Sequence, residues 1–123
     1  MIRGVVNSDG VPEIMLRVAG RDWPTTIDMG FNGDLELPEA LRAHVNARYA
    51  MQTVSLLAGG QQLTEASYDV DFPFDGRMVA AESTFVGFDG ILLGTNLLRD
   101  YRLTVDFVAR TVLLERVASS PGQ

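Results

Sequence analysis

Short apolar segments that end in turn-forming residues recur along the chain, and this pattern constrains the fold more than any other feature. The first two segments, at 2–6 and 13–19, are joined by the loop 7–10, whose sequence NSDG favours a hairpin turn. Apolar residues occupy every second position from 14 to 18, as in a strand with one buried face. The segment before Asp28 is rich in β-branched residues, so three strands are predicted ahead of Asp28.

The second half of the chain repeats this pattern. Two hairpin-type turns, at 58–61 and 75–76, are expected to connect long extended segments, and a final hairpin follows. The predicted extended segments are residues 52–57, 63–74, 78–88, 91–94, 102–107 and 111–117.

Two short helices are predicted between the strands. Pro38 suits the first position of a helix, and Glu39 suits the positive end of the helix dipole. Thr95 or Asn96 can cap the second helix, at 97–99. With eight or nine strands, the sequence predicts a mainly β domain that is partly closed, so that few strand edges remain exposed.

The size and composition of the chain fit one compact unit. A chain of 123 residues is typical of one domain, and 46% apolar residues suffice for a hydrophobic core. We therefore expect a single domain over 1–117. The residues at 118–123 are small, polar and turn-forming, and they are expected to form a flexible tail.

The charge and residue usage exclude several classes of partner. Ten basic and sixteen acidic side chains give a net charge of −6, and basic residues form no run. Nucleic acid is not an expected partner, because it binds through clustered positive charge. The lack of cysteine excludes disulfides and fits a reducing compartment. No apolar stretch is long enough for a signal peptide or a membrane span, so a cytoplasmic protein without a membrane partner is expected.

Other titratable residues are better explained by structure than by chemistry. His44, the single histidine, has no nucleophile motif to serve, so a surface or boundary position is expected. Asp69, Asp71 and Asp75 lack the spacing of a calcium loop, and strand acids that face water explain them better. One histidine and no cysteine provide no usual zinc site, so no metal or cofactor is predicted.

The segment TTIDMGFNGDLELP, at 25–38, places Asp28 between an apolar strand and a glycine-containing turn. Gly30 and Gly33 allow turn conformations that most residues avoid. A carboxylate fixed on such a turn, with apolar residues on both sides, is placed for chemistry. The local pattern also fits an ordinary turn aspartate whose side chain bonds nearby backbone. Both interpretations stay open at the level of this segment.

The order of segments around Asp28 resembles that of the retropepsin-like aspartic proteases. The resemblance is to the small prokaryotic single-domain group with the signature Asp-Thr-Gly-Phe. Here the signature is DMGF at 28–31, and its partner motif is ILLGTNLL at 91–98. The segments AAES at 80–83 and YRLTVDF at 101–107 are also similar to that group. The two motifs occur in the expected order, with a Gly-Gly hairpin between them.

The resemblance implies a retropepsin-like fold and a role for each motif. Asp28 becomes the catalytic residue of an aspartic endopeptidase that acts on peptides or proteins. The resemblance also implies an active-site loop (Ile27, Met29, Gly30, Phe31), residues that support this loop from behind (Leu92, Leu93, Gly94) and a flap over the substrate (Ala58, Gly59, Gly60, Gln61).

The chain has one such acid motif where the chemistry needs two. Aspartic proteases hydrolyse peptides with two carboxylates that share one proton, because two acids so close cannot easily both ionise. The resemblance therefore implies a homodimer in which Asp28 of each subunit meets its copy at a twofold axis. The paired acids would activate the attacking water and titrate as a unit.

Met29 departs from the signature, which has threonine at this position. In the related proteins the threonine hydroxyl makes hydrogen bonds across the dimer axis, and methionine cannot donate them. We expect a weaker dimer with reduced activity. An alternative is an inactive relative that binds peptide or a protein partner in the same cleft. A structural accessory role is a third alternative, which the sequence neither supports nor excludes.

Overall fold

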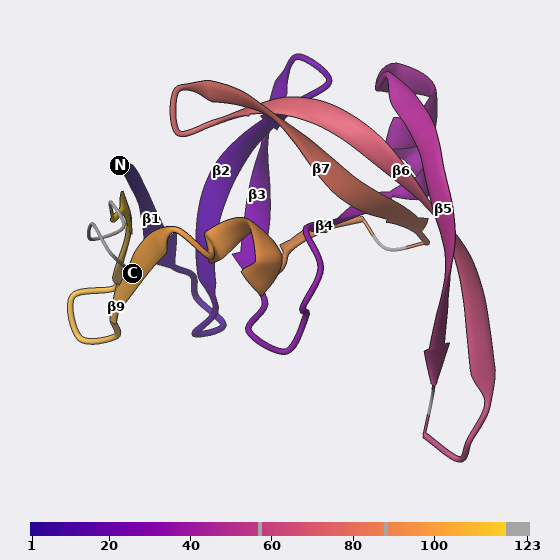
Figure 1. Cartoon of the computed structure of the whole chain (residues 1–123). Coiled ribbons are helices and arrows are strands. Elements are labelled where there is room, and N and C mark those ends of the chain that lie inside the picture. Colours follow the sequence, from indigo (N-terminus) through magenta and orange to yellow (C-terminus); the bar gives the residue numbers. More distant parts are fainter. Residues whose placement is uncertain (57, 88, 118–123) are drawn as a thin grey trace, which may run out of the picture.

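The structure of the chain is a computed structural model that describes residues 1–56, 58–87 and 89–117 (Figure 1). The described part has ten strands and two 3-10 helices: β1 (Ile2–Val6), β2 (Pro12–Val18), β3 (Arg21–Ile27), β4 (Leu35–Pro38), η1 (Glu39–His44), β5 (Ala47–Leu56), β6 (Gln62–Phe74), β7 (Arg77–Val86), β8 (Ile91–Leu93), η2 (Thr95–Leu98), β9 (Tyr101–Asp106) and β10 (Thr111–Arg116). The tail predicted at 118–123 lies outside the described residues. The single domain over 1–117 remains a prediction.

The ten strands join in one sheet with the order β5-β6-β7-β4-β8-β3-β2-β1-β10-β9. The sheet bends over itself, so that β6 packs against β2 although the two strands are far apart in this order (Figure 1). The strands β5 and β9 remain as its two edges. The predicted mainly β, partly closed architecture is confirmed.

The hydrophobic core forms where the sheet bends back on itself. On β2, alternate residues point into the core, so that Ile14, Leu16 and Val18 are buried while the residues between them are exposed. The core also takes side chains from β4, β6, β8 and β10, including Leu35, Leu37, Val70, Phe72, Ile91, Leu93 and Leu114. Burial of each large apolar side chain contributes roughly 1.5–3 kcal/mol to folding.

The middle of the sheet positions the loop 28–34, which we call the acid turn. β3 pairs in parallel with β8, and Ile27 lies opposite Leu93. β4 pairs with β8 on its other side, and there Leu35 lies opposite the same Leu93. The acid turn therefore crosses over the end of β8, from one of its neighbours to the other.

The structure differs from the sequence prediction in three places. The described residues form ten strands and not eight or nine, because β4, with only four residues, was not predicted as a strand. β5 begins at Ala47 and not at residue 52. Its first part was not predicted, because a bulge between Tyr49 and Met51 interrupts the pairing with β6 and disturbs the alternation. The N-cap of η2 is Gly94, with no side-chain capping bond. The expected caps contact the acid turn instead.

Candidate active site

Asp28 is the first residue after β3 and begins the acid turn. Its backbone N–H donates to the carbonyl of Leu93 at 3.0 Å, which extends the pairing of β3 with β8. Its carbonyl accepts the N–H of Phe31 at 3.2 Å, and its carboxylate Oδ1 accepts the N–H of Gly30 at 2.9 Å. Backbone and side chain are both bonded, so the partly exposed carboxylate has a defined direction.

The chain directly behind the acid turn is the end of β8 and the start of η2. Three consecutive backbone N–H groups, at 94–96, donate to carbonyls of the acid turn at 2.9, 2.9 and 3.1 Å. The accepting carbonyls belong, in that order, to Asp34, Phe31 and Gly33. A Cβ on Gly94 would lie 2.1 Å from the carbonyl oxygen of Gly33, so only glycine fits this contact. The structure thus places Leu93 and Gly94 behind the acid turn, and their supporting role stays a prediction.

The other residues assigned to the active-site loop have different environments. Ile27 is buried at the end of β3, whereas Met29 is 65% exposed at the tip of the turn. Gly30 is exposed beside it, and Phe31 is partly buried. Leu92, assigned to the loop support, is partly buried in the middle of β8. The exposed Met29 offers an apolar contact surface next to the candidate catalytic acid.

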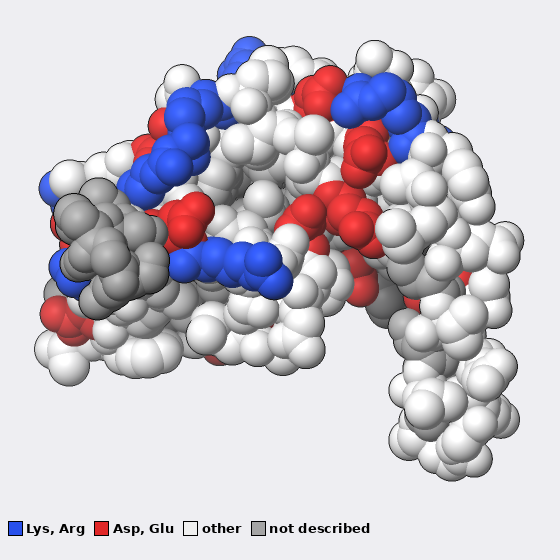
Figure 2. All heavy atoms as spheres, in the orientation of Figure 1, with Lys and Arg blue, Asp and Glu red and all other residues white. Residues whose placement is uncertain are grey.

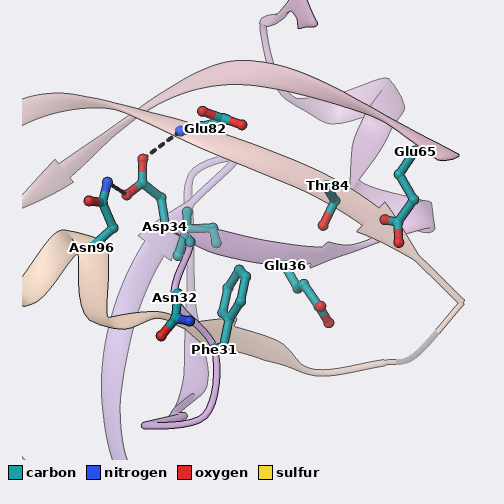
Figure 3. A pocket seen from close by; sticks show the side chains of 10 residues that line it. Phe31, Asn32, Asp34, Glu36, Glu65, Glu82, Thr84 and Asn96 are labelled. Carbon is teal, nitrogen blue, oxygen red and sulfur yellow. Dashed lines mark hydrogen bonds between the residues drawn. The ribbon is translucent and has the colours of Figure 1, made fainter. Parts of the chain in front are cut away.

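A cleft of about 480 Å³ opens beside the acid turn (Figure 3). Its lining includes the ring of Phe31 and four acidic residues, Asp34, Glu36, Glu65 and Glu82, which come from the acid turn, β4, β6 and β7. Within the described part of the chain, no basic side chain lines this cleft. The cleft is therefore negative in character.

The environment of the cleft raises the pKa of Glu36. Burial raises the pKa of Glu36 above its usual value, and the negative charges of Glu65 and Asp28 raise this pKa further. Asp28 thus influences the cleft although it lies beside the lining and not in it. Figure 2 shows acidic side chains gathered in the hollow between the body of the molecule and the projecting β5–β6 hairpin. Such a concave negative surface attracts positive groups.

The β5–β6 hairpin, to which the flap was assigned, projects away from the rest of the sheet (Figure 1). At its tip Gly59 and Gly60 have φ angles of 90° and 83°, which glycine adopts without strain. Ala58 and Gln61 are exposed beside them. Large apolar side chains along the hairpin are also exposed: Tyr49, Met51, Val54, Leu56 and Leu63.

The other titratable residues that were considered from the sequence are exposed or are bonded to neighbouring groups. His44 is exposed on η1, as predicted. Asp71 is exposed and forms a bidentate ion pair with Arg48, both contacts being 2.9 Å. Asp75 does not face water from a strand as predicted, because it lies in the β6–β7 turn and binds the N-terminal amino group and the hydroxyl of Tyr101.

Two negative findings apply to residues 1–56, 58–87 and 89–117. No three His, Asp or Glu side chains among these residues are arranged to hold a metal ion. No helix formed by them is long and apolar enough to cross a membrane.

Several residues of the cleft were not predicted from the sequence. Glu36 could have been found, because its neighbours on β4 are apolar and face the core, so Glu36 must point to the other side. Asp34 and Asn96 had no such signal. Their side chains form a hydrogen bond, but they are 62 positions apart in the chain.

Comparison with known proteins identifies similar folds. No family model matches the sequence, and no curated protein matches it. A retropepsin-like aspartic protease from Rickettsia conorii is similar with a TM-score of 0.62 and 19% identity, over 92% of this chain and 88% of that one. The simian foamy virus (mac) protease has a TM-score of 0.54 and 23% identity, over 68% and 87% of the two chains. The EIAV protease, complexed with the inhibitor HBY-793, has a TM-score of 0.58 and 19% identity, over 76% and 90%.

Proposed function

Because the chain has the retropepsin-like fold, we propose that it is an aspartic endopeptidase that acts as a homodimer. The observation that carries the proposal is the position of Asp28. Its carboxylate is held by the N–H of Gly30 at 2.9 Å, at the start of a turn beside an acidic cleft. The resemblance to the retropepsin-like proteases implies the catalytic role for the same acid.

Peptide hydrolysis by this route needs two carboxylates that share one proton. Each chain supplies one Asp28, so the second comes from another copy across a twofold axis. The ionised carboxylate takes a proton from water as the water oxygen attacks the peptide carbonyl, and the protonated one gives its proton to the carbonyl oxygen. When the C–N bond breaks, the leaving nitrogen takes the proton that the first carboxylate received from water. A hydroxyl of the tetrahedral intermediate gives its proton to the second carboxylate, so the pair is again singly protonated.

The substrate in this proposal is an extended peptide that lies between the acid turn and the β5–β6 hairpin. An extended chain can form main-chain hydrogen bonds with strand-like backbone on both sides. The hairpin would close over it and exclude water from the reacting bond. The tip glycines, Gly59 and Gly60, fit this role because their left-handed conformation makes a tight and exposed turn.

The test is Asp28→Asn. The asparagine Oδ1 can still accept the N–H of Gly30, so the fold should persist while the ionisable group is lost. We expect peptide cleavage to disappear at every pH from mildly acidic to neutral, with an unchanged unfolding midpoint in urea. Asp100→Asn, an identical change at an exposed site, is the control and should keep full activity. Cleavage that survives in Asp28→Asn would overturn the proposal.

A second candidate function is peptide binding without hydrolysis, and Met29 is the observation that favours it. Methionine removes the hydroxyl that the resemblance assigns to the dimer contact, and its side chain is 65% exposed. Calorimetric titration with an extended peptide separates the two functions. Tight binding by both the natural protein and Asp28→Asn, with no turnover in either, would favour the binding function.

A further inference from the structure

Asp34 is the last residue of the acid turn, and its side chain is buried, with 9% of the residue exposed. Its Oδ2 accepts the backbone N–H of Glu82 on β7 at 2.8 Å, and its Oδ1 accepts Nδ2 of Asn96 in η2 at 2.6 Å (Figure 3). Its backbone carbonyl accepts the N–H of Gly94 at 2.9 Å. One residue thus bonds the acid turn to β7 and to the segment that follows β8.

From these contacts we infer that Asp34 is a positioning residue, which together with Asn96 fixes the acid turn that presents Asp28. The effect on catalysis rests on the proposed function. The effect on the acid turn itself does not, because it concerns hydrogen bonds within one chain.

The chemistry of the contact requires an acceptor on both sides of the Asp34 side chain. The Glu82 N–H can only donate, and Nδ2 of Asn96 also donates. A carboxylate accepts both, and its charge strengthens both bonds. Left without these donors, a buried carboxylate would be strongly unfavourable. Asp34 and its two partners therefore hold one another in a single arrangement.

This arrangement affects the position of Asp28 through the acid turn, which has no regular secondary structure of its own. The turn is bonded at its first residue by Asp28 to Leu93, within the turn by backbone N–H groups of η2, and at its last residue by Asp34. If the attachment through the Asp34 side chain fails, only backbone bonds hold the turn against η2, and the turn can move more easily. Catalytic groups displaced by about 1 Å can lose on the order of 100-fold in rate.

Three variants test whether the Asp34–Asn96 hydrogen bond itself, and not the identity of either residue, fixes the acid turn. Asn96→Asp places a second carboxylate against Asp34, where the present contact is 2.6 Å. Asp34→Asn is milder, because the new Oδ1 can accept the Glu82 N–H while its NH₂ donates to a flipped Asn96 amide. The double variant Asp34→Asn with Asn96→Asp exchanges the two groups and restores a donor facing an acceptor. Asn46→Asp makes the same chemical change at an exposed position and is the matched control.

The structural measurement is amide hydrogen exchange, followed by NMR in the full chain. In Asn96→Asp the amides at 94–96 should exchange at least about fivefold faster, since a penalty of roughly 1–3 kcal/mol corresponds to about five- to 150-fold in the opening equilibrium. The amides of β2 should not change. Exchange at 94–96 should return close to the natural rate in the double variant, and Asn46→Asp should behave like the natural protein.

The catalytic measurement uses the same variants with an extended peptide. Asn96→Asp should lose about 100-fold in kcat, and the two limbs of its pH profile should move closer together, because a looser pair of acids shares its proton less well. The double variant should recover both properties. A purely structural contribution would lower the amount of folded enzyme and leave the pH profile unchanged.

Outcomes that overturn the inference are distinct from those that overturn the proposed function. Unchanged exchange at 94–96 in Asn96→Asp, or no recovery in the double variant, would show that the Asp34–Asn96 bond does not fix the acid turn. If Asn96→Asp does not fold, normal exchange and activity in the double variant support the inference, and persistent loss contradicts it. A natural protein that cleaves no peptide contradicts the proposed function only, and the exchange measurement still decides the role of Asp34.

Discussion

Glu36 is a residue whose charge opposes folding. Because its pKa is raised in the folded chain, chiefly by burial and then by Glu65 and Asp28, the unfolded chain loses this proton first as the pH rises. The folded state is therefore penalised as the pH rises from the usual carboxyl value through the raised one, and the penalty persists above it. Below the usual value both states are protonated and the penalty is absent.

Glu36→Gln should accordingly raise the free energy of unfolding at about pH 7 and leave it nearly unchanged at about pH 3. Urea denaturation of both proteins at the two pH values measures this difference. An equal change at both pH values would mean that the ionised form of Glu36 is not the cause.

Met29 is the residue at which the chain departs from the signature it resembles. Met29→Thr restores a hydroxyl beside Asp28, and two new hydrogen bonds across a twofold axis should tighten the proposed dimer by about ten- to a thousandfold. Analytical ultracentrifugation over a range of concentrations measures the dissociation constant. Met78→Thr is the control, because Met78 is exposed to a similar degree, 70% against 65%, but lies on β7. Equal dissociation constants for Met29→Thr and the natural protein would contradict the assignment of position 29.

At the scale of single residues, the sequence identified residues that belong to a local motif and missed those that do not. Asp28 was found because it begins the motif DMGF, which resembles the signature of a protease family. Asp34 lies in the same quoted segment but was not singled out, because its role depends on Glu82 and Asn96, which are 48 and 62 positions away. Contacts of this kind follow from the pairing of strands and not from local pattern.

At the scale of elements, the meeting of the acid turn with the end of β8 depends on close backbone approach. Gly94→Ala would place a Cβ 2.1 Å from the carbonyl oxygen of Gly33. Because this oxygen belongs to the backbone, it cannot easily move to relieve the clash. We expect a loss of about 1–3 kcal/mol or more in the free energy of unfolding, together with a loss of cleavage. Gly87→Ala, where a Cβ meets nothing within 4 Å, should change stability by less than about 0.5 kcal/mol. Urea denaturation compares them, and similar effects of both substitutions would contradict the close-approach argument.

The sequence predicted most elements because strand alternation and turn residues are local signals. It missed the first part of β5, where the bulge between Tyr49 and Met51 disturbs the alternation. It also assigned Thr95 and Asn96 to capping η2, since their side chains suit that role. In the structure Thr95 Oγ1 bonds the carbonyl of Phe31 and Asn96 bonds Asp34, so tertiary partners replace the local ones.

At the scale of the whole molecule, a net charge of −6 combines with an acidic cleft beside the proposed catalytic residue. The carboxylates that line the cleft come from the acid turn, β4, β6 and β7, so bending of the sheet brings together charges that the sequence keeps apart. A concave surface of one sign concentrates the field and raises the local concentration of ligands of opposite sign. A positively charged peptide should therefore be favoured over a negatively charged one.

Two peptides that differ only in Arg or Glu residues flanking the cleaved bond test this expectation, with a Gln peptide as the neutral reference. The Arg peptide should have the lowest KM and the Glu peptide the highest. Charges in a partly open cleft are screened by salt, and the Debye length falls from about 8 Å at 0.15 M to about 3 Å at 1 M. The ratio of the two KM values should therefore shrink as salt is added, while the KM of the Gln peptide changes little. A preference for the Glu peptide, or a ratio that does not depend on salt, would mean that the charge of the cleft does not select the substrate.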